Sequence, residues 1–437
     1  AALRKEGTVY DLPILLGLMA AGGELPALDP AAAFIGELSL TGALRPINGV
    51  LSMALATVRA GISSLYLPAA NAAEATLVEG LAVYPVPDLL TLYDHLTGRV
   101  PLSPAKPWTP QAAPEVLGPD FSEVMGQENV KRALEVAAAG QHNILLVGSP
   151  GSGKSMLARR LPSILPDMTN QEALEATEVW SVAGLTDKEH PLLLRRPFRA
   201  PHHTLSAAAM VGGGSQPGPG EVSLAHHGVL FLDELPEFQR PVLEVLRQPI
   251  EEGEVTITRV AGTIRLPSRF MLVCAMNPCP CGWHGHPSGR CRCSAHQVAG
   301  YARRISGPML DRMDIHVEVP AVEFDAMRRR TTPESSAVVR ERVNAARGRQ
   351  LARFQGTPVT CNAHMTPEMV GRFCTLDDTS EDLLRKAFDN LGLTARSHDR
   401  ILRVARTIAD LDGAEQISPV HLAEALQYRN VDILKDV

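Results

Sequence analysis

Long apolar segments are missing from this chain of 437 residues. No apolar run reaches the roughly 18 residues that a membrane-spanning helix needs, and the run at residues 12–21 is interrupted by Pro13 and Gly17. A secretory signal peptide is also missing. We therefore expect no membrane segment and a cytoplasmic location. Because the chain starts without Met inside what reads as a domain, we also expect that an N-terminal piece is missing.

An excess of positive charge is missing too, because the formal net charge is −6. Any contact with nucleic acid must therefore come from local basic patches. Seven cysteines, four of them clustered, do not form the framework of a disulfide-rich secreted protein. Tandem repeats, which would indicate a solenoid, are absent. A hydrophobic content of 45% and a charged content of 21% are typical of a globular protein.

Proline spacing and length indicate several domains. At 437 residues the chain is too long for one core. Prolines at 101, 104, 107, 110, 114 and 119 prevent regular structure and predict a linker over 101–120. Before it, residues 1–100 mix strands, expected at 34–40 and 64–68, with helices, expected at 50–60 and 88–96. After it, we expect a nucleotide-binding core over 121–320 and a helical domain over 321–437.

The most informative motif is GSPGSGKS at 148–155, which fits the phosphate-loop pattern G-x-x-x-x-G-K-[ST]. A buried strand is expected before it, at 143–147, and a helix after it. Glycines let successive N–H groups point at one anion, and the helix N-terminus adds its positive dipole end. The predicted ATP-binding residues are Gly148, Ser149, Pro150, Gly151, Ser152, Gly153, Lys154 and Ser155. Lys154 would reach the β/γ-phosphates and Ser155 would hold Mg²⁺.

Two further buried strands are expected to end in polar residues. The first, VLFL at 229–232, is followed by Asp233 and Glu234. Asp233 would hold Mg²⁺ through water and Glu234 would polarise the attacking water. An ordinary strand-to-helix cap would explain this pair alone, but it becomes a weak alternative once the phosphate loop is present. The second strand, at 270–276, precedes Asn277, which can orient water near the γ-phosphate.

Two spaced arginines complete the candidate ATPase set. Arg312 could stabilise transition-state charge in a neighbouring subunit, and Arg396 could reach the phosphates from the helical domain. For each arginine alone, a surface or ion-pair role is an equal alternative.

This order of features is similar to that of AAA+ ATPases. The resemblance implies that Asn277 is sensor 1, Arg312 the arginine finger and Arg396 sensor 2, and that Gln127 flanks the adenine. It implies an α/β fold: a P-loop AAA+ core with a parallel sheet and a C-terminal helical lid. Segments 199–204, 211–215, 305–312 and 405–410 resemble the magnesium-chelatase-like branch and, within it, the ComM family. The resemblance covers nearly the whole chain.

The N-terminal region resembles an α+β Lon-protease domain, through residues 5–7, 36–42 and 59–62. The proteolytic residues do not match. Glu6-Gly-Thr-Val-Tyr10 replaces the Asp-Gly-Pro-Ser of Lon, and Leu51 and Met53 stand where Lon has lysines. Without a base a serine is a poor nucleophile, so we expect an inactive peptidase fold.

The resemblance implies a homo-hexameric ATP-driven ring that acts on single-stranded, forked or branched DNA. Its expected task is branch migration of recombination intermediates in natural transformation. The main alternative is a chelatase-type remodeller, whose ATP cycle acts on a protein partner that inserts a metal into a tetrapyrrole. An ATP-dependent protease is a third hypothesis.

Local DNA-binding elements are expected in three places. A β-hairpin over 253–266, turning near 261–262, carries Arg259 and Arg265, which could touch phosphates in a ring pore. Packing on its own domain is the alternative for this hairpin. The glycine-rich insert 211–220 is a second pore-loop candidate, or a disordered loop. Basic residues at 328–330 and on a helix at 339–354 could bind DNA, with a solvated helix face or ion pairs between subunits as the alternatives.

A cysteine cluster follows Asn277. Its four members are Cys279, Cys281, Cys291 and Cys293, in the pattern C-x-C-x₉-C-x-C. Four thiolates could close a tetrahedral structural zinc site, but the usual spacing is C-x₂₋₄-C. Reduced free thiols are an equal alternative, and a disulfide is a third. The adjacent histidine pairs at 202–203 and 226–227 are not expected to chelate one ion.

Overall fold

The computed structural model describes residues 8–110, 118–213, 218–259, 262–321, 333–391 and 395–429. The chain folds into two compact units. The first consists of Ala1–Glu115 and Met168–Arg195, and the second of Val116–Asp167 and Arg196–Val437. The return of residues 168–195 to the first unit was not among the expectations from the sequence. The predicted boundaries at 100, 120 and 320 stay a prediction, and residues 5–7, which support the Lon resemblance, lie outside the described residues.

The first unit contains a three-stranded parallel sheet in the order β1-β4-β5. Its strands are β1 (Ala32–Phe34), β4 (Ser64–Pro68) and β5 (Ala82–Val86), with β2 (Glu37–Leu38) and β3 (Leu44–Arg45) paired separately. Its helices are α1 (Asp11–Ala21), α2 (Val50–Arg59), α3 (Ala72–Ala75), α4 (Leu89–Leu96) and α7 (Asn170–Val182). The helices predicted at 50–60 and 88–96 and the strand at 64–68 are confirmed.

The single strand predicted over 34–40 is wrong, because the chain leaves one sheet there and enters another. The N–H of Ile35 still donates to the carbonyl of Tyr66 in β4, whereas the N–H of Gly36 donates to Val9. The next residue, Glu37, pairs with Arg45 of β3. Gly36 suits this junction because an added Cβ would lie 3.2 Å from Leu44.

Helix α7 is part of the first unit because it packs on α2. The N–H of Gly49 donates to the carbonyl of Ser181 (2.9 Å), and Ser52 Oγ donates to Glu178 Oε1 (2.9 Å). Residues 101–110 form no helix or strand, as the proline spacing predicts. They nevertheless follow the unit's surface, since the N–H groups of Ala105 and Trp108 bond to the first unit.

The second unit is built on a five-stranded parallel sheet in the order β12-β6-β11-β8-β7. The strands are β6 (Ile144–Val147), β7 (Phe198–Arg199), β8 (Val229–Leu232), β11 (Met271–Met276) and β12 (Ile315–Glu318). Strands β6, β8 and β11 are buried along their whole length, as expected for a sheet with both faces covered. The predicted α/β class with a parallel sheet is confirmed.

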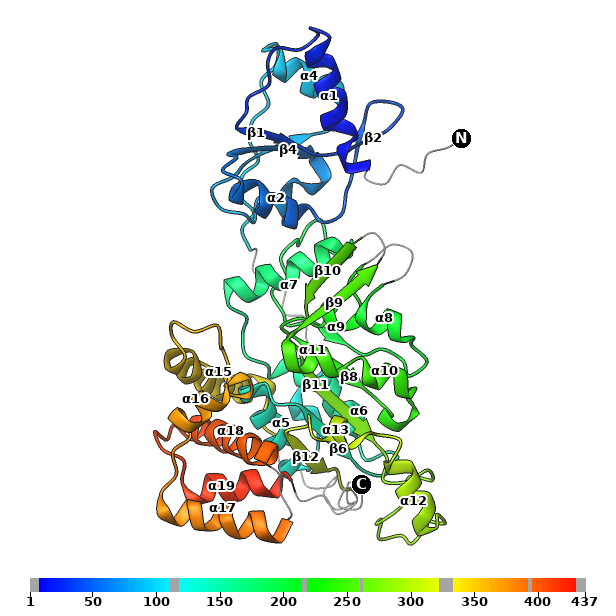
Figure 1. Ribbon diagram of the computed structural model, residues 1–437, viewed down its shortest axis with the longest axis vertical. Helices are drawn as coiled ribbons and strands as arrows, with labels where there is room; N and C mark the ends of the chain where they lie inside the picture. Colours follow the sequence, from blue (N-terminus) through cyan, green and yellow to red (C-terminus); the bar gives the residue numbers. More distant parts are fainter. Residues whose placement is uncertain are drawn as a thin grey trace. The chain divides into compact units, whose positions relative to one another are not determined.

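Helices and one hairpin surround this sheet (Figure 1). They are α5 (Glu128–Gly140), α6 (Lys154–Arg160), α8 (Ala207–Val211), α9 (Glu221–Leu224), α10 (Arg240–Glu244), α11 (Arg247–Glu252), β9 (Glu254–Arg259), β10 (Gly262–Pro267), α12 (Ala295–Ala302) and α13 (Gly307–Leu310). The predicted hairpin is confirmed, but its turn residues 260–261 lie outside the described residues. In the described residues, no helix is long and apolar enough to cross a bilayer.

The C-terminal region is helical, as predicted. It consists of α15 (Ser336–Arg353), α16 (Pro367–Phe373), α17 (Asp378–Leu391), α18 (Ala395–Leu411) and α19 (Pro419–Gln427), shown in brown to red in Figure 1. One hydrophobic cluster joins these helices to α5 and to one face of the sheet. The N–H of His316 in β12 also donates to the carbonyl of Tyr428 (2.7 Å).

Candidate nucleotide site

The phosphate loop connects the end of β6 to the start of α6. Lys154 is the first residue of α6 and is 8% exposed. Its Nζ donates to the carbonyls of Gly148 (2.7 Å) and Ser149 (2.9 Å), so the ammonium group is held over the loop. Burial lowers the pKa of Lys154, against the opposing effect of the charges of Asp233 and Glu234.

The loop is shaped for close backbone approach to an anion. A Cβ on Gly148 would lie 2.4 Å from the carbonyl oxygen of Val319, so only glycine fits there. Gly153 adopts a left-handed φ of 92° just before the helix starts. Ser152 Oγ is buried without a hydrogen-bond partner among the described residues. A concave loop with an unsatisfied buried hydroxyl fits a bound phosphate group.

A serine at the start of α6 and an aspartate at the end of β8 meet beside this loop. Ser155 Oγ donates to Asp233 Oδ2 at 2.6 Å, although the two residues are 78 positions apart. Asp233 directly follows β8 and Ser155 is in the first turn of α6. Paired hydroxyl and carboxylate oxygens are the hard ligands that Mg²⁺ prefers, so these residues fit the predicted metal.

Glu234 has an unusual backbone conformation and a partner that the sequence did not predict. Its φ of 53° is left-handed, which turns the chain sharply after β8. Its carboxylate is 57% exposed, and Oε2 lies 3.6 Å from Nδ1 of His203. His203 follows β7, the neighbouring strand. The sequence RAPHHT at 199–204 supports the family resemblance, but nothing in it indicates that His203 meets Glu234.

Asn277 completes the group at this edge of the sheet. It follows β11, which lies between β6 and β8. Its Oδ1 accepts a hydrogen bond from Lys154 Nζ at 3.2 Å. The structure therefore brings together four of the predicted side chains, Lys154, Ser155, Asp233 and Asn277, from three adjacent strands.

Gln127 lies on the other side of the phosphate loop. Its Nε2 donates to the carbonyls of Ser152 (2.7 Å) and Pro320 (3.0 Å), and its φ of 59° is left-handed. An open pocket of about 470 Å³ is lined by Gln127, Glu128, Asn129, Val130, Glu318 and Pro320. The role of Gln127 beside the base of a nucleotide stays a prediction.

Arg312 lies at the opposite end of β6. Its carbonyl accepts a hydrogen bond from Asn143 Nδ2 (3.0 Å), and Asn143 directly precedes β6, whereas Gly148 follows it. Five extended residues span about 16 Å. The guanidinium group pairs with Glu251 and donates to the carbonyl of Pro308 (2.5 Å). Arg312 therefore does not contact the phosphate loop of its own chain.

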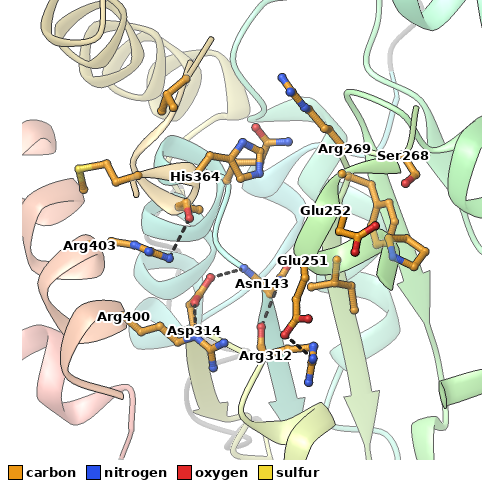
Figure 2. Close-up of a pocket in the computed structure, with 18 of the residues that line it drawn as sticks. Asn143, Glu251, Glu252, Ser268, Arg269, Arg312, Asp314, His364, Arg400 and Arg403 are labelled. Carbon is orange, nitrogen blue, oxygen red and sulfur yellow. Dashed lines mark hydrogen bonds and ion pairs between the residues drawn. The ribbon is translucent and has the colours of Figure 1, made fainter. Parts of the chain in front are cut away.

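A second pocket, of about 380 Å³, surrounds this end of the sheet (Figure 2). Arg269, Arg312, Arg400 and Arg403 line it together with Asp314 and Glu251. Arg396 is at the start of α18, next to Ser397, whose Oγ accepts from Arg429 (3.3 Å). Arg429 also donates to the carbonyl of Met313, the residue after Arg312 (2.6 Å). The two predicted arginines are thus grouped with each other and not with Lys154.

Four of the five arginines in the predicted basic surface on α15 bond within the chain, whereas Arg340 is exposed, so a DNA contact there stays a prediction. Arg342 pairs with Glu135 (2.6 Å) and Glu334 (2.5 Å), and Arg353 pairs with Asp410. Arg347 is buried and Arg349 donates to a backbone carbonyl (2.8 Å). The alternative of ion pairs between subunits is not what these contacts are, because all of them lie within one chain. Residues 328–330 and 214–217 lie outside the described residues.

Known families match most of the chain. Residues 120–327 match the family described as magnesium chelatase, subunit ChlI, and residues 333–429 match its C-terminal family. Residues 1–71 match a third family, described as subunit ChlI of Mg-chelatase.

Individual relatives are similar over nearly the whole chain. Competence protein ComM of Haemophilus influenzae is 45% identical, over 98% of this chain and 84% of the relative. Uncharacterized protein YifB of Escherichia coli is 43% identical, over 99% of this chain and 84% of the relative. The magnesium-chelatase 38 kDa subunit of Cereibacter sphaeroides is 25% identical, over 69% of this chain and 88% of the relative. The chain therefore belongs to the ComM-like branch of the magnesium-chelatase-like AAA+ family.

Proposed function

We propose that this protein hydrolyses ATP as a ring motor acting on DNA, and that it drives branch migration of recombination intermediates in natural transformation. One observation carries the proposal: Lys154, Ser155, Asp233 and Asn277 meet at the carboxyl edge of a parallel sheet. Ligands of open α/β sheets bind at that edge. The similarity to a relative named competence protein supplies the biological setting.

Each side chain has a task that its position supports. Lys154 would exchange its two carbonyl partners for phosphate oxygens, and Ser155 and Asp233 would hold Mg²⁺. Bound Mg²⁺ would neutralise charge on the phosphates. Glu234 would accept a proton from the attacking water, and Asn277 would orient that water. His203 Nδ1 lies 3.6 Å from Glu234 Oε2 and would be the nearest neighbour of this base.

Support for a ring comes from the separation of the two halves of the site. Arg312 and Arg396 lie at the amino edge of the sheet, at the end of β6 opposite to Lys154. An arginine that stabilises charge on ATP must therefore come from another copy of the chain. If each copy places its Arg312 edge against the Lys154 edge of the next copy, the contact is head-to-tail. Head-to-tail contacts produce a closed ring or a helical filament. We propose the ring, in a hexamer.

Support for a DNA contact comes from the β9–β10 hairpin. Val255 and Ile257 are buried against the second unit and anchor one face of it. Its other face is exposed and carries Arg265, whose side chain is 73% exposed. The side chain of Arg259 lies outside the described residues. Arg265 also lies 3.9 Å from Glu254 Oε1, an exposed ion pair that a phosphate could replace. An anchored hairpin with an exposed cation can contact a phosphate backbone without reading sequence.

The proposal is tested by branch migration and by DNA-stimulated ATP turnover on forked, single-stranded and duplex substrates. Wild type should be active, whereas Lys154→Ala should lose ATP binding and Glu234→Gln should bind ATP without turnover. Equal branch migration by wild type and both variants would end the motor proposal.

A chelatase-type remodeller is the second candidate, because the matched families carry the magnesium chelatase name. In that case stable co-purification with a chelatase partner and weak, salt-insensitive DNA binding are expected. The Lon-like, proteolytically inactive character of the first unit is also part of the proposal. A casein degradation assay with ATP tests it, and no cleavage is expected.

A further inference from the structure

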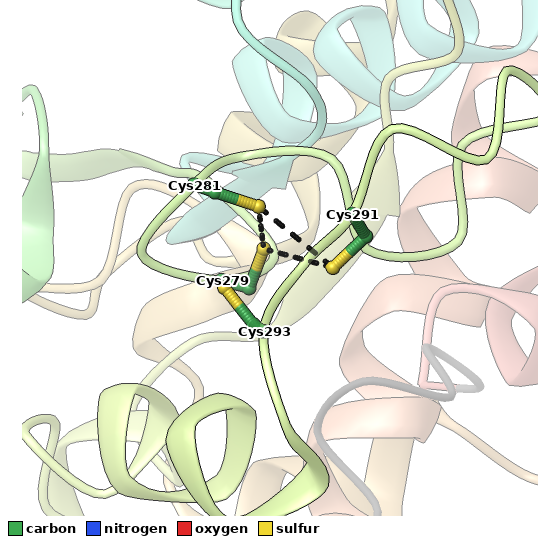
Figure 3. A group of neighbouring side chains, drawn as sticks. All are labelled: Cys279, Cys281, Cys291 and Cys293. Carbon is green, nitrogen blue, oxygen red and sulfur yellow. Dashed lines mark hydrogen bonds between the residues drawn. The ribbon is translucent and has the colours of Figure 1, made fainter.

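Four cysteine thiols converge between Asn277 and helix α12 (Figure 3). The sulfur of Cys279 lies 3.4 Å from that of Cys281 and 3.9 Å from that of Cys291, and the last two are 3.7 Å apart. All four sulfurs, including that of Cys293, lie within 4.8 Å of one another. A disulfide would need a sulfur separation of about 2 Å, so these are four thiols grouped around one centre.

The spacing matches a particular metal geometry. Four sulfurs at about 2.3 Å from a tetrahedral Zn²⁺ are about 3.8 Å from one another. The three distances above scatter around that edge length. Four thiolates also leave no open position for water, which is the arrangement of structural zinc.

Backbone N–H groups surround the sulfurs. Those of Arg292 and Trp283 donate to the sulfur of Cys281. The backbone of Cys293 bonds the sulfur of Cys291, and that of Cys281 bonds the sulfur of Cys293. Such outer hydrogen bonds orient metal ligands and stabilise their charge.

The segment needs a cross-link because it has almost no core of its own. Between Asn277 and Ala295 the chain forms no helix or strand, and none of residues 283–294 is buried. A loop of this length without buried side chains is poorly fixed by packing. A metal held by residues at both ends of the loop would close it.

This loop touches the phosphate loop. Gly282 lies between two of the cysteines with a left-handed φ of 83°. A Cβ added there would be 2.4 Å from Cγ of Pro150 and 3.8 Å from Cγ of Asn277. The turn fixed by Cys279 and Cys281 therefore packs directly on the phosphate loop and on the asparagine that contacts Lys154.

We infer that Cys279, Cys281, Cys291 and Cys293 bind one structural zinc ion, and that this site braces the phosphate loop through the contact of Gly282 with Pro150. The metal assignment is independent of the proposed function. The bracing role rests on the proposed binding of ATP.

Metal content tests the first half. The full chain, purified without chelators under reducing conditions, should contain about one zinc per chain by elemental analysis. Replacement by Co²⁺ should produce the absorption of a tetrahedral thiolate site. The variant Cys291→Ser/Cys293→Ser should lose the metal, whereas Cys374→Ser, a buried cysteine outside the cluster, should keep it. Cys291→His should retain zinc if the serine variant fails to fold. Iron in place of zinc, or wild type without metal and without cobalt absorption, would overturn the assignment.

Nucleotide affinity tests the second half. Gly282→Ala should keep its zinc but bind a fluorescent ATP analogue at least several-fold more weakly, because its Cβ would displace Pro150. The control is Gly285→Ala, since Gly285 has a similar φ of 74° but no neighbour within 4 Å. Equal loss in both variants, or none in Gly282→Ala, would overturn the bracing role. A chain that holds zinc but never binds ATP would instead refute the proposed function and leave the zinc site standing.

Discussion

Lys154 Nζ donates to Asn277 Oδ1 across 3.2 Å, which joins the phosphate loop to the neighbouring strand. Asn277→Ala should therefore lower ATP turnover by roughly 10- to 100-fold while changing ATP affinity only a few-fold, because its task concerns the attacking water. Steady-state turnover and equilibrium nucleotide binding measure the two effects. Asn344→Ala, which removes a contact with Asp167 (2.9 Å), serves as control. Unchanged ATP turnover in Asn277→Ala would show that Asn277 has no role in ATP hydrolysis.

The separation of Arg312 from Lys154 along β6 predicts complementation between inactive variants. Arg312→Ala should lose roughly 1000-fold or more in turnover, and Lys154→Ala should be inactive. Mixed together, the two chains should regain activity, because about a quarter of random interfaces pair an intact Lys154 with an intact Arg312.

The matched control for this mixture replaces Arg312→Ala by the double variant Arg312→Ala/Lys154→Ala. In that mixture no chain contributes an intact Lys154, so turnover should stay at background. Sedimentation verifies that the chains co-assemble. Robust turnover by Arg312→Ala alone would show that this arginine is not the finger.

Asp314 predicts how stability depends on pH. Burial alone would raise the pKa of Asp314, but the hydrogen bond and charge of His142, the charge of Arg400 and the N–H of Asn143 lower it to about 2. The pKa of Asp314 in the folded protein lies below its unfolded value of about 3.9. The ionised carboxylate therefore contributes fully to the free energy of unfolding above about pH 3.9, and this contribution is lost as pH falls toward 2. It amounts to about 2–3 kcal/mol.

Asp314→Asn should therefore lower the free energy of unfolding at neutral pH by about 2–4 kcal/mol and flatten its decline below about pH 4. Urea unfolding from about pH 3 to pH 7 measures both. Asp382→Asn, an exposed position on α17, should change neither. If the free energy of unfolding of Asp314→Asn declined below about pH 4 as steeply as that of wild type, Asp314 would not be the group responsible for this pH dependence.

Arg265 predicts the salt dependence of DNA binding. Arg265→Ala should weaken binding to every DNA sequence alike and reduce the slope of log affinity against log salt by about 0.9. Fluorescence anisotropy over a salt series measures this slope. Arg304→Ala, which breaks an exposed pair with Glu237 (3.1 Å), is the control of equal charge change. An unaltered slope in Arg265→Ala would exclude the hairpin from the DNA contact.

The parallel strands and the residues at their ends could be predicted because local sequence determines them. Four apolar residues followed by acids predicted β8 and Asp233, and a fixed motif predicted Lys154. The contact between Glu234 and His203 could not be predicted, because it depends on which strands are neighbours in the sheet. The ion pairs of Arg342 and Arg353 on α15 could not be predicted for the same reason, since Glu135 and Asp410 come from other helices.

Helix α7 lies in sequence between the phosphate loop and Asp233, yet it folds with the N-terminal residues. It packs on α2, and Ala173, Ala176, Thr177 and Ser181 are buried. A recombinant fragment starting near residue 120 would keep every ATP-site side chain. It would also keep α7 but lack α2, the helix on which α7 packs. Such a truncation should aggregate, so excision of α7 together with the first unit is the sounder way to obtain a minimal ATPase.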